Sequence, residues 1–144
     1  MCRHGDTMTA EGASMTWTLR FADDVIDART PNTRGHWSGR QRSAKAVREA
    51  VGLLAHAQRQ LAPVPPVAIR CTRWVTTRHK RDVDNTATSW KPALDGLVDA
   101  GVLPADDWTV VVEVAYRIRL AEVAGWTVEI TDVDAGHASG EAGL

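Results

Sequence analysis

Apolar and polar residues alternate in four short segments of the chain, which predicts strands with one buried face. In the first segment, for example, Trp17, Leu19 and Phe21 alternate with polar residues. The four expected strands are 16–21, 67–75, 109–120 and 125–131. The last two are close enough in the chain to be joined as a hairpin by residues 121–125.

Two segments repeat their apolar residues at helical spacing instead. The first runs from about Ser38 to Leu61, and its expected buried stripe is Val47, Val51, Leu54 and Leu61. The second begins at Ser89 and repeats Leu94, Leu97 and Val98, with Lys91 and Asp95 on another face and Gly101 as its stop. The order strand, helix, strand, helix, strand, strand predicts a small α/β fold with a mixed sheet and two main helices.

The length and composition favour one compact domain. A chain of 144 residues with 44% hydrophobic and 24% charged residues can bury one core. We expect a flexible tail at 1–14, a single domain at 15–132 and a second flexible tail at 133–144. No apolar run reaches the length of a membrane span, and the first residues have no signal-peptide pattern, so a cytoplasmic protein without a membrane partner is expected.

The net charge of −1 conceals a division of the chain into segments of opposite sign. Residues 28–81 hold twelve basic residues and one acidic residue, whereas residues 82–144 hold three basic and twelve acidic residues. A segment this basic favours binding to a polyanion such as DNA. Charge compensation between segments is the alternative, but Glu49 is the only acid within the basic segment.

The basic residues expected to contact DNA fall into three groups. They lie in an irregular loop, on the first turns of the first helix and at the end of the second strand. The residues are Arg34, His36, Arg40, Arg42, Lys45, Arg78, Lys80 and Arg81. A solvated helix face, a capping role for His36 and a folded-back Trp37 are the structural alternatives.

Acidic residues gather on both sides of the second helix. Asp82 and Asp84 stand two apart, so in an extended segment their carboxylates would leave from the same face, and Asn85 follows them. Asp106 and Asp107 come after the helix stop. Carboxylate oxygens are ligands that Mg²⁺ prefers, and a bound Mg²⁺ can polarise a phosphoryl oxygen and activate water.

Other chemistries lack their residues in this chain. Two cysteines and five histidines form no zinc-ligand pattern, and there is no Gly-rich phosphate loop for a nucleotide cofactor and no serine elbow for acyl transfer. Metal-dependent hydrolysis of a phosphodiester therefore suits the residues best.

The same stretch resembles the RusA-type Holliday junction resolvases. The resemblance rests on D-x-D-N, a lysine, D-x-L and D-D, which are here Asp82, Asp84 and Asn85, then Lys91, then Asp95 with Leu97, then Asp106 and Asp107. It implies a RusA-like fold and a homodimer that cuts four-way DNA junctions by paired nicks with Mg²⁺, for which Mn²⁺ would substitute. It also implies catalytic and metal-binding roles for Asp82, Asp84 and Asp107, a catalytic role for Lys91, and supporting roles for Asp95, Asp106 and Asn85.

One spacing departs from the family pattern, and two other functions stay open. Five residues separate Asn85 from Lys91 where the family has two. Lys91 keeps a similar bearing if the extra three residues form nearly one helical turn, and a loop could also absorb them. Trp90 could stack on a base or anchor the helix in the core. The chain could also be an inactive DNA-structure-binding accessory protein, or a nuclease for other branched or flap DNA.

Overall fold

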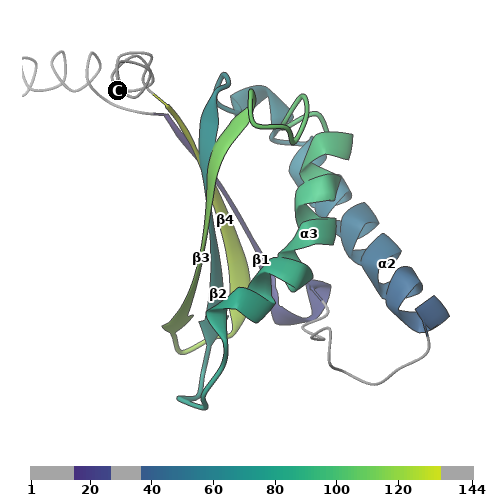
Figure 1. Cartoon of the computed structure of the whole chain (residues 1–144), viewed down its shortest axis with the longest axis vertical. Coiled ribbons are helices and arrows are strands. Elements are labelled where there is room, and N and C mark those ends of the chain that lie inside the picture. Colours follow the sequence, from purple (N-terminus) through teal and green to yellow (C-terminus); the bar gives the residue numbers. More distant parts are fainter. Residues whose placement is uncertain (1–14, 27–36, 134–144) are drawn as a thin grey trace, which may run out of the picture.

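The fold is a four-stranded mixed sheet with two helices on one side (Figure 1). The computed structural model describes residues 15–26 and 37–133, with side chains in the second range from Arg42 onward. The expected α/β class, its mixed sheet and its two main helices are confirmed. The two predicted tails and the loop with Arg34 and His36 lie outside the described residues, except for Val133 at the start of the second tail.

The strands lie close to their predicted positions. They are β1 (Thr16–Ala22), β2 (Val67–Val75), β3 (Val111–Leu120) and β4 (Gly125–Asp132). Their order across the sheet is β1-β4-β2-β3, with β4 antiparallel to both β1 and β2, and β3 parallel to β2. The alternating pattern predicted these strands well because β1 buries every second residue toward the helices.

The predicted hairpin between the last two strands is wrong. β3 pairs with β2, and β4 pairs with the other side of β2, so residues 121–124 connect two strands that are not neighbours. The cause is the helix between β2 and β3. A strand, helix, strand unit returns its second strand parallel to the first, which places β3 on the outer edge and leaves the central position to β4.

The first long helix, α2, spans Trp37–His56, and a short 3₁₀ turn follows at Arg59–Leu61. Its buried stripe is Val47, Val51 and Ala55, which are spaced by four residues. The prediction that Leu54 and Leu61 belong to this stripe is wrong, because their exposed fractions are 44% and 66%. The helix ends five residues before Leu61, so Leu61 does not continue the helical spacing of the stripe.

The second helix, α3, spans Val83–Asp99, six residues longer at its start than predicted. The run 83–88 is mostly polar, and only Thr86 in it is buried, so hydrophobic periodicity did not reveal it. Gly101 ends the helix as predicted. Its φ of 83° allows Val102 N–H to donate to Leu97 O at 3.0 Å and Gly101 N–H to Val98 O at 3.1 Å.

Trp90 on α3 anchors this helix in the core. Its ring is fully buried and meets Phe21 and Trp126 edge to face, with 5.7 Å between ring centroids in each pair. Of the two roles considered for Trp90, base stacking and core anchoring, the burial supports the anchor. The side of the sheet that carries the helices is therefore filled by aromatic rings from three elements.

The two helices cross closely at a pair of glycines. A Cβ on Gly96 of α3 would lie 2.5 Å from Arg48 O and 3.1 Å from Gly52 N of α2. Beside this crossing, Arg48 binds Asp99 through two hydrogen bonds, one of them 2.8 Å from Nη2 to Oδ1. Arg48 on the basic face of α2 is thus engaged in holding the helices together.

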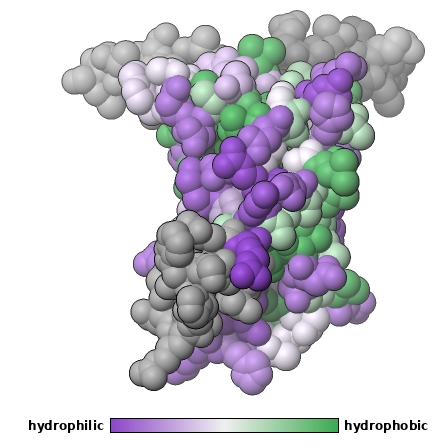
Figure 2. All heavy atoms as spheres, turned by 90° about the vertical axis from the view of Figure 1, so that its right-hand side faces the viewer, coloured by the Kyte–Doolittle hydropathy of each residue, from purple (hydrophilic) through white to green (hydrophobic). Residues whose placement is uncertain are grey.

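The outer surface of the helical layer mixes hydrophilic and apolar areas (Figure 2). Leu53 and Leu54 of α2 contribute exposed apolar surface, with exposed fractions of 79% and 44%. Within the described residues, no helix is both long enough and apolar enough to cross a bilayer.

Candidate active site

The start of α3 separates the two aspartates that sequence analysis placed together. Asp82 is the extended residue before the helix, and Asp84 lies in its first turn. The expected extended segment with both carboxylates on one face is therefore wrong. Asp82 has extended φ and ψ and Asp84 is helical, so the alternation of a strand does not hold across this pair.

Asp82 lines a hollow of about 330 Å³ at the start of α3. Side chains from β2, from the connection after it and from the first two turns of α3 line this hollow. They are Arg73, Lys80, Arg81, Asp82, Asn85, Thr86 and Ser89. Asn85 Nδ2 lies 3.5 Å from Asp82 Oδ2, so the predicted supporting residue does lie beside Asp82.

The connection between β2 and α3 is held in shape by Arg81. Its guanidinium donates to Thr77 O and His79 O, each at 3.0 Å, and to Thr77 Oγ1 at 2.9 Å. Part of the hydrogen-bonding capacity of Arg81, a predicted DNA contact, is therefore used within its own loop. Arg78 and Lys80, the other predicted DNA contacts on this connection, are exposed.

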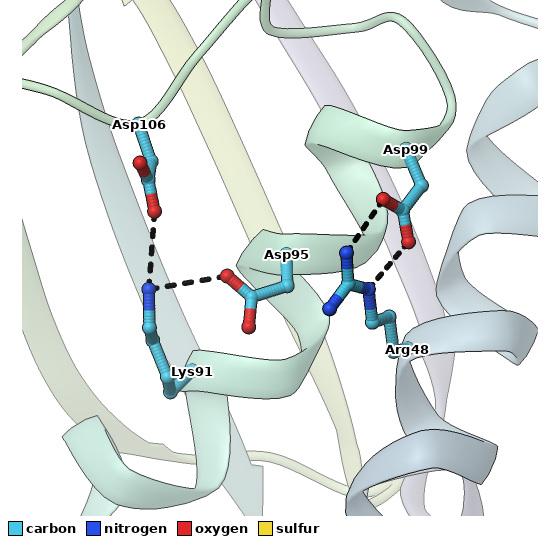
Figure 3. Close-up of polar contacts among 5 residues, drawn as sticks. All are labelled: Arg48, Lys91, Asp95, Asp99 and Asp106. Atoms are coloured by element: carbon cyan, nitrogen blue, oxygen red, sulfur yellow. Dashed lines mark hydrogen bonds and ion pairs between the residues drawn. The ribbon is translucent and has the colours of Figure 1, made fainter.

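A second group of charged residues surrounds Lys91 on α3 (Figure 3). Lys91 Nζ lies 3.1 Å from Asp95 Oδ1 and 3.1 Å from Asp106 Oδ2. Hydrogen bonds to Asp95 and then to Asp106 raise the pKa of Lys91, so its charge is retained in the neutral range. The contact with Asp106 brings the acidic pair after α3 back against the helix.

The residues between Asn85 and Lys91 are helical throughout. Asp84 and Lys91 are seven residues apart, so they share one face of α3 at a separation of about 10 Å along the axis. Asp95 continues that face one turn further. The face that carries Asp84, Lys91 and Asp95, together with Asp106, is called the acidic face below.

Asp107 follows Asp106 and is held by the chain after it. Its Oδ1 accepts hydrogen bonds from Thr109 Oγ1 and, at 2.8 Å, from Thr109 N–H. These two bonds, the hydroxyl bond first, lower the pKa of Asp107. A smaller contribution to the same shift comes from the backbone N–H of Val110.

The structure brings together some of the predicted site residues but does not assemble the predicted metal centre. Across residues 15–26 and 37–133, no three Asp, Glu, His or Cys side chains form a group that could hold a metal ion. Asp82 lines the hollow, whereas Asp84 lies on the acidic face and Asp107 lies in the loop after α3. The expected meeting of these three carboxylates is not seen in this arrangement.

The remaining predicted DNA contacts lie on α2 or outside the described part of the chain. Arg42 and Lys45 are exposed, and Lys45 makes a 3.9 Å ion pair with Glu49. Arg40 lies in α2, but its side chain is outside what the structure describes, as are Arg34 and His36 altogether.

Arg73 lines the hollow and was not among the predicted site residues. It occupies a buried-face position of β2, in register with Trp126 of β4 and Ile118 of β3. The sequence contained a signal for it, because Arg73 is the one charged residue in the alternation Val67, Ile69, Cys71, Arg73, Val75.

Comparisons with known proteins add no relative to this description. No protein-family model matches the chain, and a search of curated proteins finds no significant match.

Proposed function

We propose that this protein is a Mg²⁺-dependent endodeoxyribonuclease that cuts branched DNA, with four-way junctions as its substrate. The observation that carries the proposal is the contact between Lys91 and Asp106. It brings the second acidic pair against the helix face that bears Asp84 and Asp95. Carboxylates and a retained ammonium charge on one surface are the groups that a phosphodiester hydrolase requires.

The basic connection before α3 supports the choice of a polyanionic substrate. Arg78 and Lys80 are exposed, and Arg81 is fixed in the same loop. A DNA strand held by these cations would have its phosphates next to the start of α3. Binding that depends on such contacts weakens as salt rises, with a log–log slope of about −0.9 per phosphate on duplex DNA.

The predicted Mg²⁺ suits the chemical type of the available ligand atoms, but the structure does not group them around one point. Asp82, Asp84 and Asp107 supply the hard oxygen ligands that Mg²⁺ prefers. They do not form a three-carboxylate group within the described residues. Their proposed role as metal ligands therefore rests on the chemistry of their oxygens.

Two active sites are needed for paired nicks, so the proposal includes a homodimer. Each copy would contribute one Asp84 and Lys91 set and would cut one strand of the junction. Size measurement in solution, at the concentration used for cleavage, tests this part separately.

The central experiment incubates the full chain with a labelled synthetic four-way junction and Mg²⁺ or Mn²⁺. Wild-type protein should give paired nicks, and Asp84→Asn should abolish nicking while binding is kept. Glu122→Gln, on the exposed connection after β3, is the matched control and should cut normally. Absence of nicks from folded wild-type protein would contradict the proposal, and loss of binding by Asp84→Asn would assign that residue a structural role.

A DNA-binding protein without nuclease activity is the second candidate. The observation that favours it is that Asp82, Asp84 and Asp107 form no three-carboxylate group within the described residues, whereas catalysis by a shared metal requires these groups to converge. It predicts salt-dependent junction binding without nicks under any divalent metal. Cleavage of flap or forked DNA in preference to the four-way junction would instead indicate a different branched substrate.

A further inference from the structure

The guanidinium of Arg73 lies between the sheet and the helices. Its central carbon is 5.1 Å from the centroid of the Trp126 ring, so it stacks over a fully buried aromatic side chain. Its Nε is buried and has no hydrogen-bond partner within the described residues. A buried donor without a partner is unfavourable, so an Arg at this position calls for a compensating group.

Most of the charged residues that line the hollow with Arg73 are positive. Lys80 and Arg81 line the same hollow, and among the residues that the structure describes Asp82 is the only acidic one in its lining. Burial first, and then the nearby Arg81, lower the pKa of Arg73, while Asp23 on another side opposes this effect. Three cations and one carboxylate therefore line this hollow, whereas Asp23 and Asp24 lie with Arg73 around a neighbouring hollow.

Neutral hydrogen-bonding groups complete the lining. Asn85, Thr86 and Ser89 belong to the first two turns of α3, and the side chain of Thr86 already donates to Val83 O at 2.6 Å. Ser89 is buried and has a hydroxyl that can rotate toward a ligand. Guanidinium, ammonium and hydroxyl donors around one hollow match the oxygens of a phosphate group.

We propose that this hollow binds a single phosphate group, with Arg73 as its innermost cationic donor. The assignment to DNA rests on the proposed function and makes the ligand a backbone phosphate held on the Asp82 side of α3. The same chemistry would recognise a free phosphate ion. The phosphate would place its negative charge beside the three cations that line this hollow.

The test measures thermal unfolding of the full chain in sodium phosphate and in sodium chloride of equal ionic strength. Wild-type protein should be stabilised by phosphate beyond chloride, and Arg73→Gln should lose this extra shift. Arg70→Gln is the matched control, since Arg70 lies on the same strand, is exposed and does not line the hollow. Equal shifts in Arg73→Gln and wild type, or no phosphate-specific shift in wild type, would overturn the proposal.

A second variant keeps the test decisive if Arg73→Gln does not fold. Lys80 is exposed, so Lys80→Gln should leave the fold intact and weaken phosphate binding by about tenfold, the loss expected for one charge-assisted hydrogen bond. Unchanged affinity in titration calorimetry with inorganic phosphate would count against the site.

Competition identifies the source of the phosphate. If DNA supplies it, inorganic phosphate should displace the junction more strongly than chloride of equal ionic strength, and Arg73→Gln should remove that difference. Phosphate binding that leaves DNA affinity unchanged would support the site and assign it to a free phosphate. Asp84 does not line the hollow, so Asp84→Asn should retain the stabilisation by phosphate. If wild-type protein binds phosphate but never cuts DNA, the nuclease proposal is refuted and the phosphate site is not.

Discussion

Lys91 and Asp106 are fifteen residues apart in the chain, yet Nζ of one lies 3.1 Å from Oδ2 of the other. The loop after α3 is thereby drawn onto the acidic face at the point where Asp95 also binds Lys91. Lys91 consequently neutralises part of the charge of the carboxylates on this face. Its role can be separated from the fold because its side chain is 61% exposed.

Replacement of Lys91 by Met should slow single-turnover nicking by about 10²-fold, the usual effect of removing one fixed charge at a reacting phosphate. Junction affinity and the melting temperature should change little. Lys91→Arg keeps the positive charge and should retain more activity. Equal activity of Lys91→Met and wild type would show that Lys91 only organises Asp95 and Asp106.

The pH dependence of stability should reveal the bonds to Asp107. The folded pKa of Asp107 is lowered, first by the Thr109 hydroxyl, so the stabilisation is present above the unfolded value of about 3.9 and is lost as pH falls through the folded pKa. Thr109→Val removes that hydroxyl. It should therefore be less stable than wild type at pH 7, and the difference should shrink at pH 3.

Urea unfolding at the two pH values measures this change. Thr88→Val is a suitable control, because Thr88 is an exposed threonine of α3. Its stability difference from wild type should be the same at both pH values. A pH-independent effect of Thr109→Val would mean that the Asp107 bond does not govern the titration.

The crossing of α2 and α3 gives a test of the fold. In Gly96→Ala the new methyl group would lie 2.5 Å from Arg48 O, so the helices must move apart. We expect a loss of about 1–3 kcal/mol in the free energy of unfolding, even though Ala is the better helix former. Denaturant unfolding with an unchanged m-value would measure it.

Gly52→Ala is the matched variant on the facing helix. Its Cβ would lie 3.3 Å from Gly96 O, a contact that needs only a small adjustment. The gain in helix propensity, about 1 kcal/mol, should offset much of that cost. Equal destabilisation by the two substitutions would contradict the asymmetric contact.

The strands were predictable from the sequence because the alternation of apolar and polar residues is a local pattern. The candidate site was predictable only in part. Alternation in 16–21 and 67–75 located β1 and β2 because each strand buries one face. Pairing of β4 with β2 depends on the whole topology, so the pattern of 109–131 could not reveal it. Asp82 and Asp84 were misplaced for a related reason, since a polar helical start has no apolar periodicity.

Of the two contacts of Lys91, the sequence predicted the one within the helix and did not predict the one with the loop after it. Lys91 and Asp95 were expected to share a face, and their 3.1 Å contact confirms it. The meeting of Lys91 with Asp106 depends on how the Gly101 turn directs the chain, which is set by tertiary packing. Arg73 was not predicted as a site residue, because the alternation in 67–75 indicates a buried strand face and does not indicate which ligand a single charge on that face would meet.

Trp90 offers a last test, because its ring is fully buried while its Nε1 has no hydrogen-bond partner within the described residues. Trp90→Ala would leave a large cavity between Phe21 and Trp126 and should cost about 3–5 kcal/mol in the free energy of unfolding. Trp90→Phe keeps one aromatic ring and removes the unpaired N–H, whose burial is itself unfavourable. Its net cost should therefore be clearly smaller than that of Ala. Equal costs for Phe and Ala in denaturant unfolding would mean that Nε1 does have a partner that stabilises the core.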